Sequence, residues 1–249
     1  MTAIETHYAE VIGNLKVAAQ SDKKTKIKDL KKYIGTNYDF IGLSVPAQRL
    51  VAKAGFSFST NSLSDQLHIW DHIYKHGSTY EALSQPFYFL DKNARKIDPL
   101  EQWETTKKWT AKIDNWAHSD SLSEVYSRLL EIFPDQVFAQ LKKWTKSDKP
   151  WERRQSVVSL LYYSKLRKTY LPVKELLGNI SPLLEDQDYF VQKGVGWTLR
   201  EIGNIYPEEG LQFILQNCKT LRPVAFTSAI EKINAENKLL IKKARKERV

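Results

Sequence analysis

One stretch of the chain, from Phe190 to Glu201, sets a large aromatic side chain between two cations. Its apolar residues recur at helical spacing along one stripe, which predicts a buried helix face. The stripe consists of Val191, Val195, Leu199 and Ile202. Trp197 points almost the opposite way, with Lys193 at i−4 and Arg200 at i+3. Such a surface suits an anionic ligand with a flat or cationic part, although Trp197 could instead fill a second layer of the core.

Trp116 and Asp120 form a second pair with the means to do chemistry. If the segment is helical, their i, i+4 spacing places an indole ring and a carboxylate on one face. Both groups attract positive charge, so the pair suits a ligand that carries or develops a cation. The pattern Ser121-x-x-Glu124 just after them is a capping box, which signals a helix start. Asp120 could therefore be a capping residue instead.

A third candidate lies in the segment that starts at Asp148. Asp148 suits an N-cap and Pro150 suits the first turn, so a helix is expected to begin here. Arg154 then lines up with Val158 and Leu161 on the inward side of that helix. An arginine that points inward needs an anionic partner, which could be a ligand or an acidic side chain of the protein itself.

The region from Lys31 to Arg49 adds a basic and turn-rich segment near the amino terminus. It contains Lys32 and Tyr33, followed by a turn with the pattern Phe-x-Gly-x-x-x-Pro-x-x-Arg from Phe40 to Arg49. Tyr33 taken alone is typical of a core residue.

The net charge indicates an acidic partner. Lys and Arg number 38 against 29 Asp and Glu, which gives a formal charge of +9 over 249 residues. This balance favours nucleic acid or an anionic membrane surface. The last twelve residues, from Lys238 to Val249, hold six cations and one Glu and so supply +5 of that charge. We expect this tail to be a solvated, frayed helix end with too few apolar residues to anchor in a membrane.

Neither a disulfide nor a metal site is expected. Cys218 is the one cysteine, so no disulfide can form within the chain, and we expect a buried structural thiol. His68, His72 and His76 recur at helical spacing, but no Cys or Glu accompanies them at zinc-like spacing. We therefore expect no metal and no cofactor. The amino terminus lacks an apolar run and no segment reaches about 18 apolar residues, so we expect a cytoplasmic protein without a membrane span.

The periodicity of the chain is helical almost throughout, and Gly and Pro lie between the periodic segments. The predicted helices are Ile4–Ala19, Thr25–Tyr38, Pro46–Ala54, Leu63–His76, Tyr80–Ala94 with a possible break at Pro86, Pro99–Lys112, Asn115–Phe133, Asp135–Lys146, Trp151–Lys168, Val173–Leu184, Tyr189–Ile205, Pro207–Gln216 and Pro223–Lys243. No alternating strand pattern appears.

Helix pairs follow one another in the second half of the chain. They are expected over Leu122–Lys146, Trp151–Leu184 and Tyr189–Gln216, with prolines at or just before the start of several helices. Short antiparallel pairs in series predict an all-α, curved solenoid of HEAT-like repeats, whose concave surface would bind an extended partner. No Gly/Ser-rich linker interrupts the chain, so we expect residues 1–249 to form a single domain. An irregular helical bundle without a groove is the alternative.

The order and spacing of these segments resemble the AlkD-like family of DNA alkylation-repair glycosylases, which are HEAT-like solenoids. The resemblance runs from about Thr25 to Ile233. It is carried by Tyr33, the Phe40–Arg49 turn, Trp70-Asp71, Trp116-x-x-x-Asp120, Trp151-x-x-Arg154 and the block Gln192-Lys193-x-x-Gly-Trp-x-Leu-Arg-Glu ending at Glu201. The chain departs from the family in the Tyr80–Lys92 region, which is longer and contains Pro86. It also departs in the segment 225–230, which lacks a basic residue.

The resemblance implies an enzyme that releases cationic alkylated purines from double-stranded DNA without a metal or cofactor. Trp116, Asp120 and Trp197 would form the catalytic cluster. Arg154 would contact the DNA backbone beside the lesion, and Tyr33 would lie near the lesion-containing strand. Further groove cations that could hold phosphates are Lys32, Arg153, Lys193 and Arg200. We expect a monomer with no obligate protein partner.

Two other functions fit the same features. The groove could bind DNA structure without excising a base, or the helical repeats could be a scaffold for a protein partner. A scaffold predicts an apolar inner ridge, whereas aromatic residues mixed with Lys and Arg are expected here.

Overall fold

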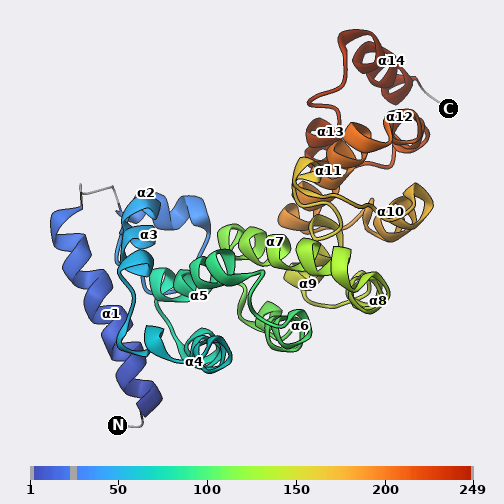
Figure 1. The fold of residues 1–249 in the computed structure, drawn as a ribbon. Helices are drawn as coiled ribbons and strands as arrows, with labels where there is room; N and C mark the ends of the chain where they lie inside the picture. The colour runs from blue at the N-terminus through green and yellow to red at the C-terminus, as the bar shows by residue number, and fades with distance from the viewer. Residues whose placement is uncertain (1–2, 23–26, 248–249) are drawn as a thin grey trace. The chain divides into compact units, whose positions relative to one another are not determined.

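Helices make up nearly all regular structure in the computed structural model, which describes residues 3–22 and 27–247 (Figure 1). The α-helices are α1 (Ala3–Ser21), α2 (Ile27–Ile34), α3 (Val45–Ala54), α4 (Leu63–His76), α5 (Tyr80–Asn93), α6 (Pro99–Thr106), α7 (Trp116–Ile132), α8 (Pro134–Trp144), α9 (Pro150–Val158), α10 (Val173–Ile180), α11 (Tyr189–Ile205), α12 (Pro207–Asn217), α13 (Pro223–Ala229) and α14 (Ala235–Lys246). Short 3₁₀ turns lie at η1 (Ser57–Thr60), η2 (Trp109–Lys112), η3 (Ser164–Leu166) and η4 (Ser181–Leu183). Extended pairing in the described residues is limited to one bridge between Asp39 and Thr79. The all-α prediction is confirmed.

The chain divides into two compact units, Met1–Ser121 and Leu122–Val249. Within the first unit α5 packs against α3 and α4, and within the second α11 packs against α9 and α13 (Figure 1). That residues 1–249 behave as a single domain stays a prediction.

Two helix pairs repeat the same local design. A 17-residue helix, α7 or α11, is followed after one residue by an 11-residue helix, α8 or α12. The linking residues adopt nearly the same conformation, with φ −126° and ψ 65° at Phe133 and φ −131° and ψ 71° at Tyr206. Each short helix opens on a proline, whose fixed φ suits a first helical turn. The predicted pairing of helices at prolines is confirmed here.

Several predicted helices are shorter than their apolar pattern indicated, among them those expected over Pro99–Lys112 and Val173–Leu184, which end at Thr106 and Ile180. The helix expected over Trp151–Lys168 ends at Val158, and the one expected over Pro223–Lys243 is interrupted between α13 and α14. After α9 the chain turns through Tyr163, whose φ of 44° lies in the left-handed region that interrupts a right-handed helix. Before α14, Asn234 caps the new helix by accepting the backbone N–H of Asn237 at 2.8 Å.

The basic carboxyl-terminal segment is not frayed within its described part. Ile241 of α14 is fully buried. The guanidinium of Arg245 lies 4.2 Å from the ring centroid of Phe226 and donates to the carbonyl of Leu221 at 2.7 Å and to that of Cys218. The expectation of a frayed helix end is therefore wrong for α14, because apolar and cation–π contacts stabilise it, whereas most of its side chains are exposed as expected. Cys218 is buried, as predicted.

Aromatic residues build the core of the first unit. Tyr74 stacks on Trp109 with ring centroids 4.5 Å apart, and Trp109 Nε1 donates to Asp71 Oδ1 at 2.8 Å. Trp70 packs edge-on against Phe58 at 5.0 Å. The Trp70-Asp71 pair of the family motif thus contributes to packing: its indole fills the core and its carboxylate satisfies a second, buried indole.

Candidate active site

Helix α7, which carries Trp116 and Asp120, begins at a well-formed cap. Asn115 Oδ1 accepts the backbone N–H of His118 at 2.9 Å, and the Asn115 carbonyl accepts that of Ser119 at 3.2 Å. Trp116 is therefore the first helical residue, and Asp120 lies one turn further along the same face. The alternative that Asp120 caps a helix starting near Ser121 is wrong. Trp116 and Asp120 are both half-buried.

A buried polar network fixes the start of α7. Asn115 Nδ2 donates to Asp114 Oδ1 at 2.8 Å and lies 3.1 Å from His118 Nδ1. His118 Nε2 lies 2.9 Å from Ser84 Oγ, and Tyr80 stacks on the imidazole at 4.6 Å. Because Ser84 Oγ donates to the carbonyl of Tyr80, we assign the Nε2–H tautomer to His118. Burial lowers the pKa of His118 to about 4, so this histidine stays neutral near pH 7.

Asp114 ties the segment after α2 to the start of α7. Its carboxylate accepts Thr36 Oγ1 at 2.9 Å and the backbone N–H of Asn37 at 2.7 Å. Trp116 Nε1 then donates 3.0 Å to the carbonyl of Tyr33, in the last turn of α2 where helix carbonyls lack intrahelical partners. The ring of Tyr33 lies edge-on to Trp116 with centroids 5.4 Å apart, and its side chain is 69% exposed. Tyr33 is thus a surface residue beside Trp116 and not a core residue.

In the second unit, two glycines let neighbouring helices approach the one that carries Trp197. A Cβ on Gly196 would meet the Ala225 carbonyl oxygen at 2.4 Å, so α13 lies against the backbone of α11. A Cβ on Gly194 would meet Val158 Cγ2 at 3.0 Å, so α9 packs closely on another side. Ala225 is fully buried in this contact. It begins the segment 225–230, which lacks a basic residue.

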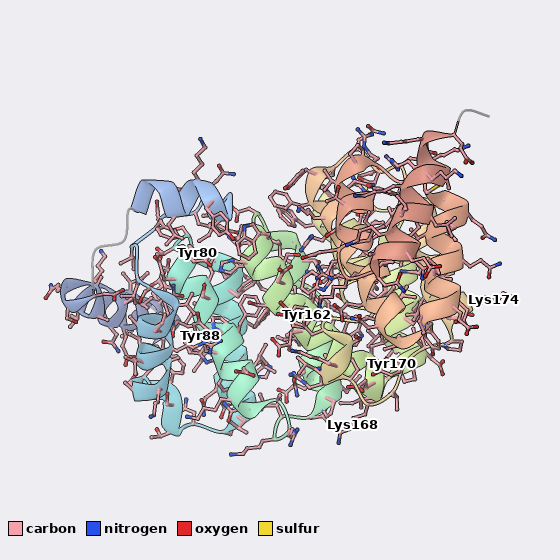
Figure 2. All side chains as sticks on the ribbon, turned by 90° about the horizontal axis from the view of Figure 1, so that it is seen from above. Tyr80, Tyr88, Tyr162, Lys168, Tyr170 and Lys174 are labelled. Carbon is pink, nitrogen blue, oxygen red and sulfur yellow. The ribbon has the colours of Figure 1, made fainter. Side chains whose placement is uncertain are left out.

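Trp197 lies within a cluster of aromatic rings. Its centroid is 5.4 Å from that of Tyr162 and 5.2 Å from that of Tyr163 (Figure 2 labels Tyr162). Tyr163 is the left-handed residue after α9, and the next residue is anchored by Glu201, whose Oε2 accepts Ser164 N at 2.8 Å and Ser164 Oγ at 2.7 Å. Trp197 is half-buried, and its Nε1 is buried without a hydrogen-bond partner among the described residues. Besides the predicted cations Lys193 and Arg200, the surroundings of the indole therefore include two tyrosines that contact it directly.

The predicted phosphate-binding cations have different surroundings. Arg154 is 4% exposed and donates from Nη1 to the Phe190 carbonyl at 2.7 Å. Arg153 forms a two-point ion pair with Asp186, with Nε 2.6 Å from Oδ2 and Nη2 3.3 Å from Oδ1. These contacts engage Arg153 inside the protein and leave it less suited to hold a phosphate than an exposed side chain.

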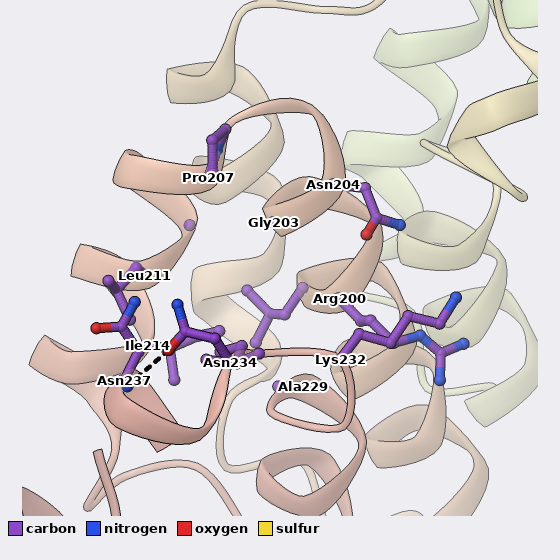
Figure 3. A pocket seen from close by; sticks show the side chains of 13 residues that line it. Arg200, Gly203, Asn204, Pro207, Leu211, Ile214, Ala229, Lys232, Asn234 and Asn237 are labelled. Atoms are coloured by element: carbon purple, nitrogen blue, oxygen red, sulfur yellow. Dashed lines mark hydrogen bonds between the residues drawn. The ribbon is translucent and has the colours of Figure 1, made fainter. Parts of the chain in front are cut away.

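Arg200 also has partners in the second unit. It pairs with Glu231 through Nη1 and lines a hollow of about 180 Å³ with Asn204 and Lys232 (Figure 3). Lys193 is exposed and lies 5.9 Å from the ring centroid of Tyr189. In the first unit Lys32 is exposed as well. These two exposed lysines are the predicted cations best suited to meet a phosphate.

The structure therefore presents two sets of site residues, each within its own unit. Tyr33, Trp116 and Asp120 lie at the junction of α2 and α7, and the Trp197 cluster lies on α11 and the turn after α9. An indole face attracts a cation, and a carboxylate attracts it more strongly at short range. Each set is chemically suited to a substrate on which positive charge develops.

A family model for DNA alkylation repair enzymes matches residues 15–233. The chain belongs to this family. Its fold is similar to that of two solved structures. One is described as a predicted DNA alkylation repair enzyme from Enterococcus faecalis, at 15% identity over 84% of this chain and 95% of that one, with a TM-score of 0.69. The other is AlkD2 from Streptococcus mutans, at 17% identity over 84% and 99%, with a TM-score of 0.55.

For this member of the DNA alkylation repair family, the structural likeness establishes the HEAT-like fold. A search of curated proteins finds no match. None of the described helices has the length and apolar character needed to cross a membrane. No group of three or more His, Cys, Asp or Glu residues suited to a metal ion occurs in the described part of the chain.

Sequence reasoning missed two residues beside Trp197 and the carboxylate that anchors the residue after them. Tyr162 and Tyr163 were assigned to a continuous helix, because the apolar residues before them keep helical spacing. Glu201 was included in the family block without a role. The pattern Tyr-Tyr-Ser after α9 gives no local sign of a left-handed residue, and the contact beside it, from Ser164 to Glu201, spans 37 residues.

Proposed function

We propose that the protein hydrolyses the N-glycosidic bond of cationic alkylated purines, of the 3-methyladenine and 7-methylguanine type, in double-stranded DNA. Membership of the DNA alkylation repair family carries the proposal, since the matched residues include Trp116, Asp120 and Trp197. The proposed catalytic residues are these three, each acting on the sugar of the damaged nucleotide. Their side chains are all half-buried, so each keeps a solvent-facing part that could meet a substrate.

The chemistry of the lesion explains why this residue set would suffice. Alkylation gives the purine a positive charge, so the base is already a good leaving group and needs little acid catalysis. The difficult charge appears on the deoxyribose, in a transition state resembling an oxocarbenium ion. A carboxylate next to the anomeric carbon stabilises that charge and can orient the attacking water. Each indole face contributes about 0.5–2 kcal/mol toward the same cation.

The proposed step is a hydrolysis. The bond from the anomeric carbon to the purine nitrogen breaks, and its electron pair leaves with the base, which becomes neutral. The oxygen of water bonds to the anomeric carbon, and Asp120 accepts a hydrogen bond from that water and takes up its proton, which then passes to solvent. The products are a neutral alkylated purine and an abasic site in DNA.

The substrate range follows from the same argument. A neutral damaged base lacks the positive charge that makes an alkylated purine a good leaving group. The proposed catalytic residues include no general acid to protonate it. Many glycosylases extrude the base into a tight pocket, whereas we propose that this protein holds the DNA backbone on an open surface. Efficient release of hypoxanthine, a neutral lesion, would contradict this restriction.

DNA would be held by its phosphates. Lys32 and Lys193 are exposed and suited to direct contacts with phosphates. Arg154 is buried, so it would contact the DNA backbone only through the small part of its side chain that is exposed. Binding that depends on phosphate contacts weakens steeply as the salt concentration rises. A weak salt dependence would favour the alternative of a scaffold for a protein partner.

The direct test uses duplex DNA treated with a methylating agent, followed by identification of the released bases. We expect the wild type to release methylated purines and the Asp120→Asn variant to release them about 100-fold more slowly, a typical loss when one charge-stabilising group is removed. Affinity for DNA should change little, because the carboxylate acts in the transition state. Asp135→Asn is a matched control, since Asp135 is an exposed carboxylate on α8.

Two outcomes would contradict the proposal. Equal release by the wild type and Asp120→Asn would remove Asp120 from the mechanism. Binding to DNA without any base release would support the alternative in which the protein recognises DNA structure but excises nothing.

A further inference from the structure

The first unit contains a cavity of about 550 Å³ that neither Trp116, Asp120 nor Trp197 lines. It lies between the second half of α3, the start of α4 and the second half of α5. Its volume falls in the range of about 300–1,000 Å³ that is usual for small-molecule sites. The cavity includes Arg49, the last residue of the Phe40–Arg49 motif, which lies on α3 and has no role in the proposed base excision.

The rim of this cavity is cationic. Arg49, Lys53, Lys92 and Lys96 line it together with a single carboxylate, that of Asp91, and all five side chains are exposed. Among the described residues none of the four cations forms an ion pair. A concave surface lined mainly by one sign of charge raises the local concentration of ions of the opposite sign. The rim is therefore suited to a phosphate or another compact anion.

Rings form the floor and one wall. Phe56, Trp70 and Phe89 line the cavity and are largely buried. Tyr88 is half-buried, and the guanidinium carbon of Arg49 lies 5.8 Å from its ring centroid (Figure 2 labels Tyr88). Burial raises the pKa of Tyr88 to about 12, so its hydroxyl stays protonated and donates to Gln48 Oε1 at 3.3 Å. A planar ligand ring would find both apolar surface and a neutral aromatic wall here.

One buried polar atom also points to a ligand. Gln85 lines the cavity and is fully buried. Its Nε2 lies 3.4 Å from two backbone carbonyls, those of Gln48 and Glu81, which can only accept and so fix the orientation of the amide. Its Oε1 has no hydrogen-bond partner among the described residues. An unsatisfied buried acceptor is costly unless a donor reaches it, and a ligand N–H could be that donor.

We propose that this cavity binds a nucleotide, with the phosphate at the cationic rim and the base against the aromatic floor near Gln85 Oε1. Cations for the phosphate, rings for the base and an acceptor for its N–H groups are the features that nucleotide recognition uses. The nucleotide can be a free monophosphate or one residue of a DNA strand. The inference goes beyond the proposed base excision and does not depend on it.

The test is calorimetric titration of the full chain at low salt with adenosine 5′-monophosphate (AMP), adenosine and inorganic phosphate. AMP is expected to bind at least tenfold more tightly than either fragment. The double variant Lys92→Ala/Lys96→Ala should weaken AMP binding at least tenfold. The double variant Lys143→Ala/Lys146→Ala is the matched control, because it removes two exposed lysines of the other unit and should bind AMP as the wild type does.

A second variant probes the floor. Gln85→Met keeps most of the side-chain volume and removes the acceptor, so AMP affinity should fall severalfold while phosphate affinity stays unchanged. Because Gln85 is buried, circular dichroism must first show that this variant folds. The rim variants replace exposed residues, so they test the proposal even if Gln85→Met does not fold.

Competition separates the two sources. Displacement of a labelled single-stranded oligonucleotide by AMP assigns the cavity to a nucleotide of the strand, and AMP binding without displacement assigns it to a free nucleotide. AMP affinity no greater than that of phosphate, or equal AMP affinity in the rim and control variants, would overturn the proposal. The Asp120→Asn variant should bind AMP like the wild type, so a failure of base excision is distinguishable from a failure of this site.

Discussion

The two tryptophans of the proposed site are held in opposite ways. Trp116 donates from Nε1 to the Tyr33 carbonyl at 3.0 Å and begins a helix whose first turn is capped by Asn115. Trp197 lies among Tyr162 and Tyr163 with its Nε1 unpaired among the described residues. Hydrogen bonds fix the first indole, and ring packing fixes the second.

The surroundings extend this difference. The start of α7 is stabilised by a hydrogen-bond network that includes Asp114 and the neutral His118. The Trp197 region depends on close helix packing at Gly196 and on the left-handed conformation of Tyr163. The two regions should therefore respond to different perturbations, one to pH and lost hydrogen bonds, the other to added volume.

The largest expected effect is on packing around Trp197. Gly196→Ala places a methyl group 2.4 Å from the Ala225 carbonyl oxygen, a backbone atom with little room to move. We expect a loss of about 3 kcal/mol in the free energy of unfolding, as for other overpacked cores. Gly203→Ala is the control in the same helix, because its Cβ would meet nothing within 4 Å. It should instead gain about 0.5–1 kcal/mol from better helix propensity. Urea unfolding measures both, and equal effects would contradict close α11–α13 packing.

The next effect is the response of the α7 region to pH. The folded pKa of His118, about 4, lies below its unfolded value of 6.5, so the unfolded state binds more protons between these values. The stability due to neutral His118 is complete above pH 6.5 and is lost as the pH falls toward 4. Between pH 7 and 5 this amounts to about 2 kcal/mol.

The measurement compares urea unfolding at pH 7 and pH 5 for three proteins. His118→Gln removes the titrating group and should lower this pH dependence, whereas replacement of the exposed His68 by Gln should leave it as in the wild type. An unchanged pH dependence in His118→Gln would show that the buried network does not exclude the proton.

The smallest effect contrasts the indoles directly. Trp116→Phe removes the hydrogen bond to Tyr33 and should cost about 1 kcal/mol of unfolding free energy, or less because the bond is near the surface. Trp197→Phe removes a buried N–H that has no partner among the described residues, so it should cost less than Trp116→Phe. A larger loss for Trp197→Phe would contradict this ranking and show that the ring contacts with Tyr162 and Tyr163 outweigh the hydrogen bond of Trp116.

Much of the fold was accessible from the sequence, because its signals are local. The periodicity of apolar residues predicted Leu63–His76 and Tyr189–Ile205 with the observed bounds, and prolines marked the starts of α8 and α12. The end of α9 was not predictable. Its apolar pattern continues past Val158, and the turn depends on Glu201, 37 residues away from Ser164.

For the candidate site, the sequence predicted only which residues share a helix face. The spacing of Trp116 and Asp120 correctly placed them one helical turn apart. The contact between Trp116 and Tyr33 depends on Asp114 and Thr36, which are 78 residues apart and carry no pairing signal in one sequence. The ion pair of Arg153 with Asp186 was hidden for the same reason.

The central claim is that the two differently held tryptophans serve one reaction. The most direct test is the single-turnover rate of base release from a duplex with one 7-methylguanine, with enzyme in saturating excess. We predict that Trp116→Leu and Trp197→Leu each lower this rate about tenfold while leaving DNA affinity nearly unchanged, since each indole face acts on charge in the transition state. A wild-type rate in either variant would contradict the account and confine the chemistry to one unit.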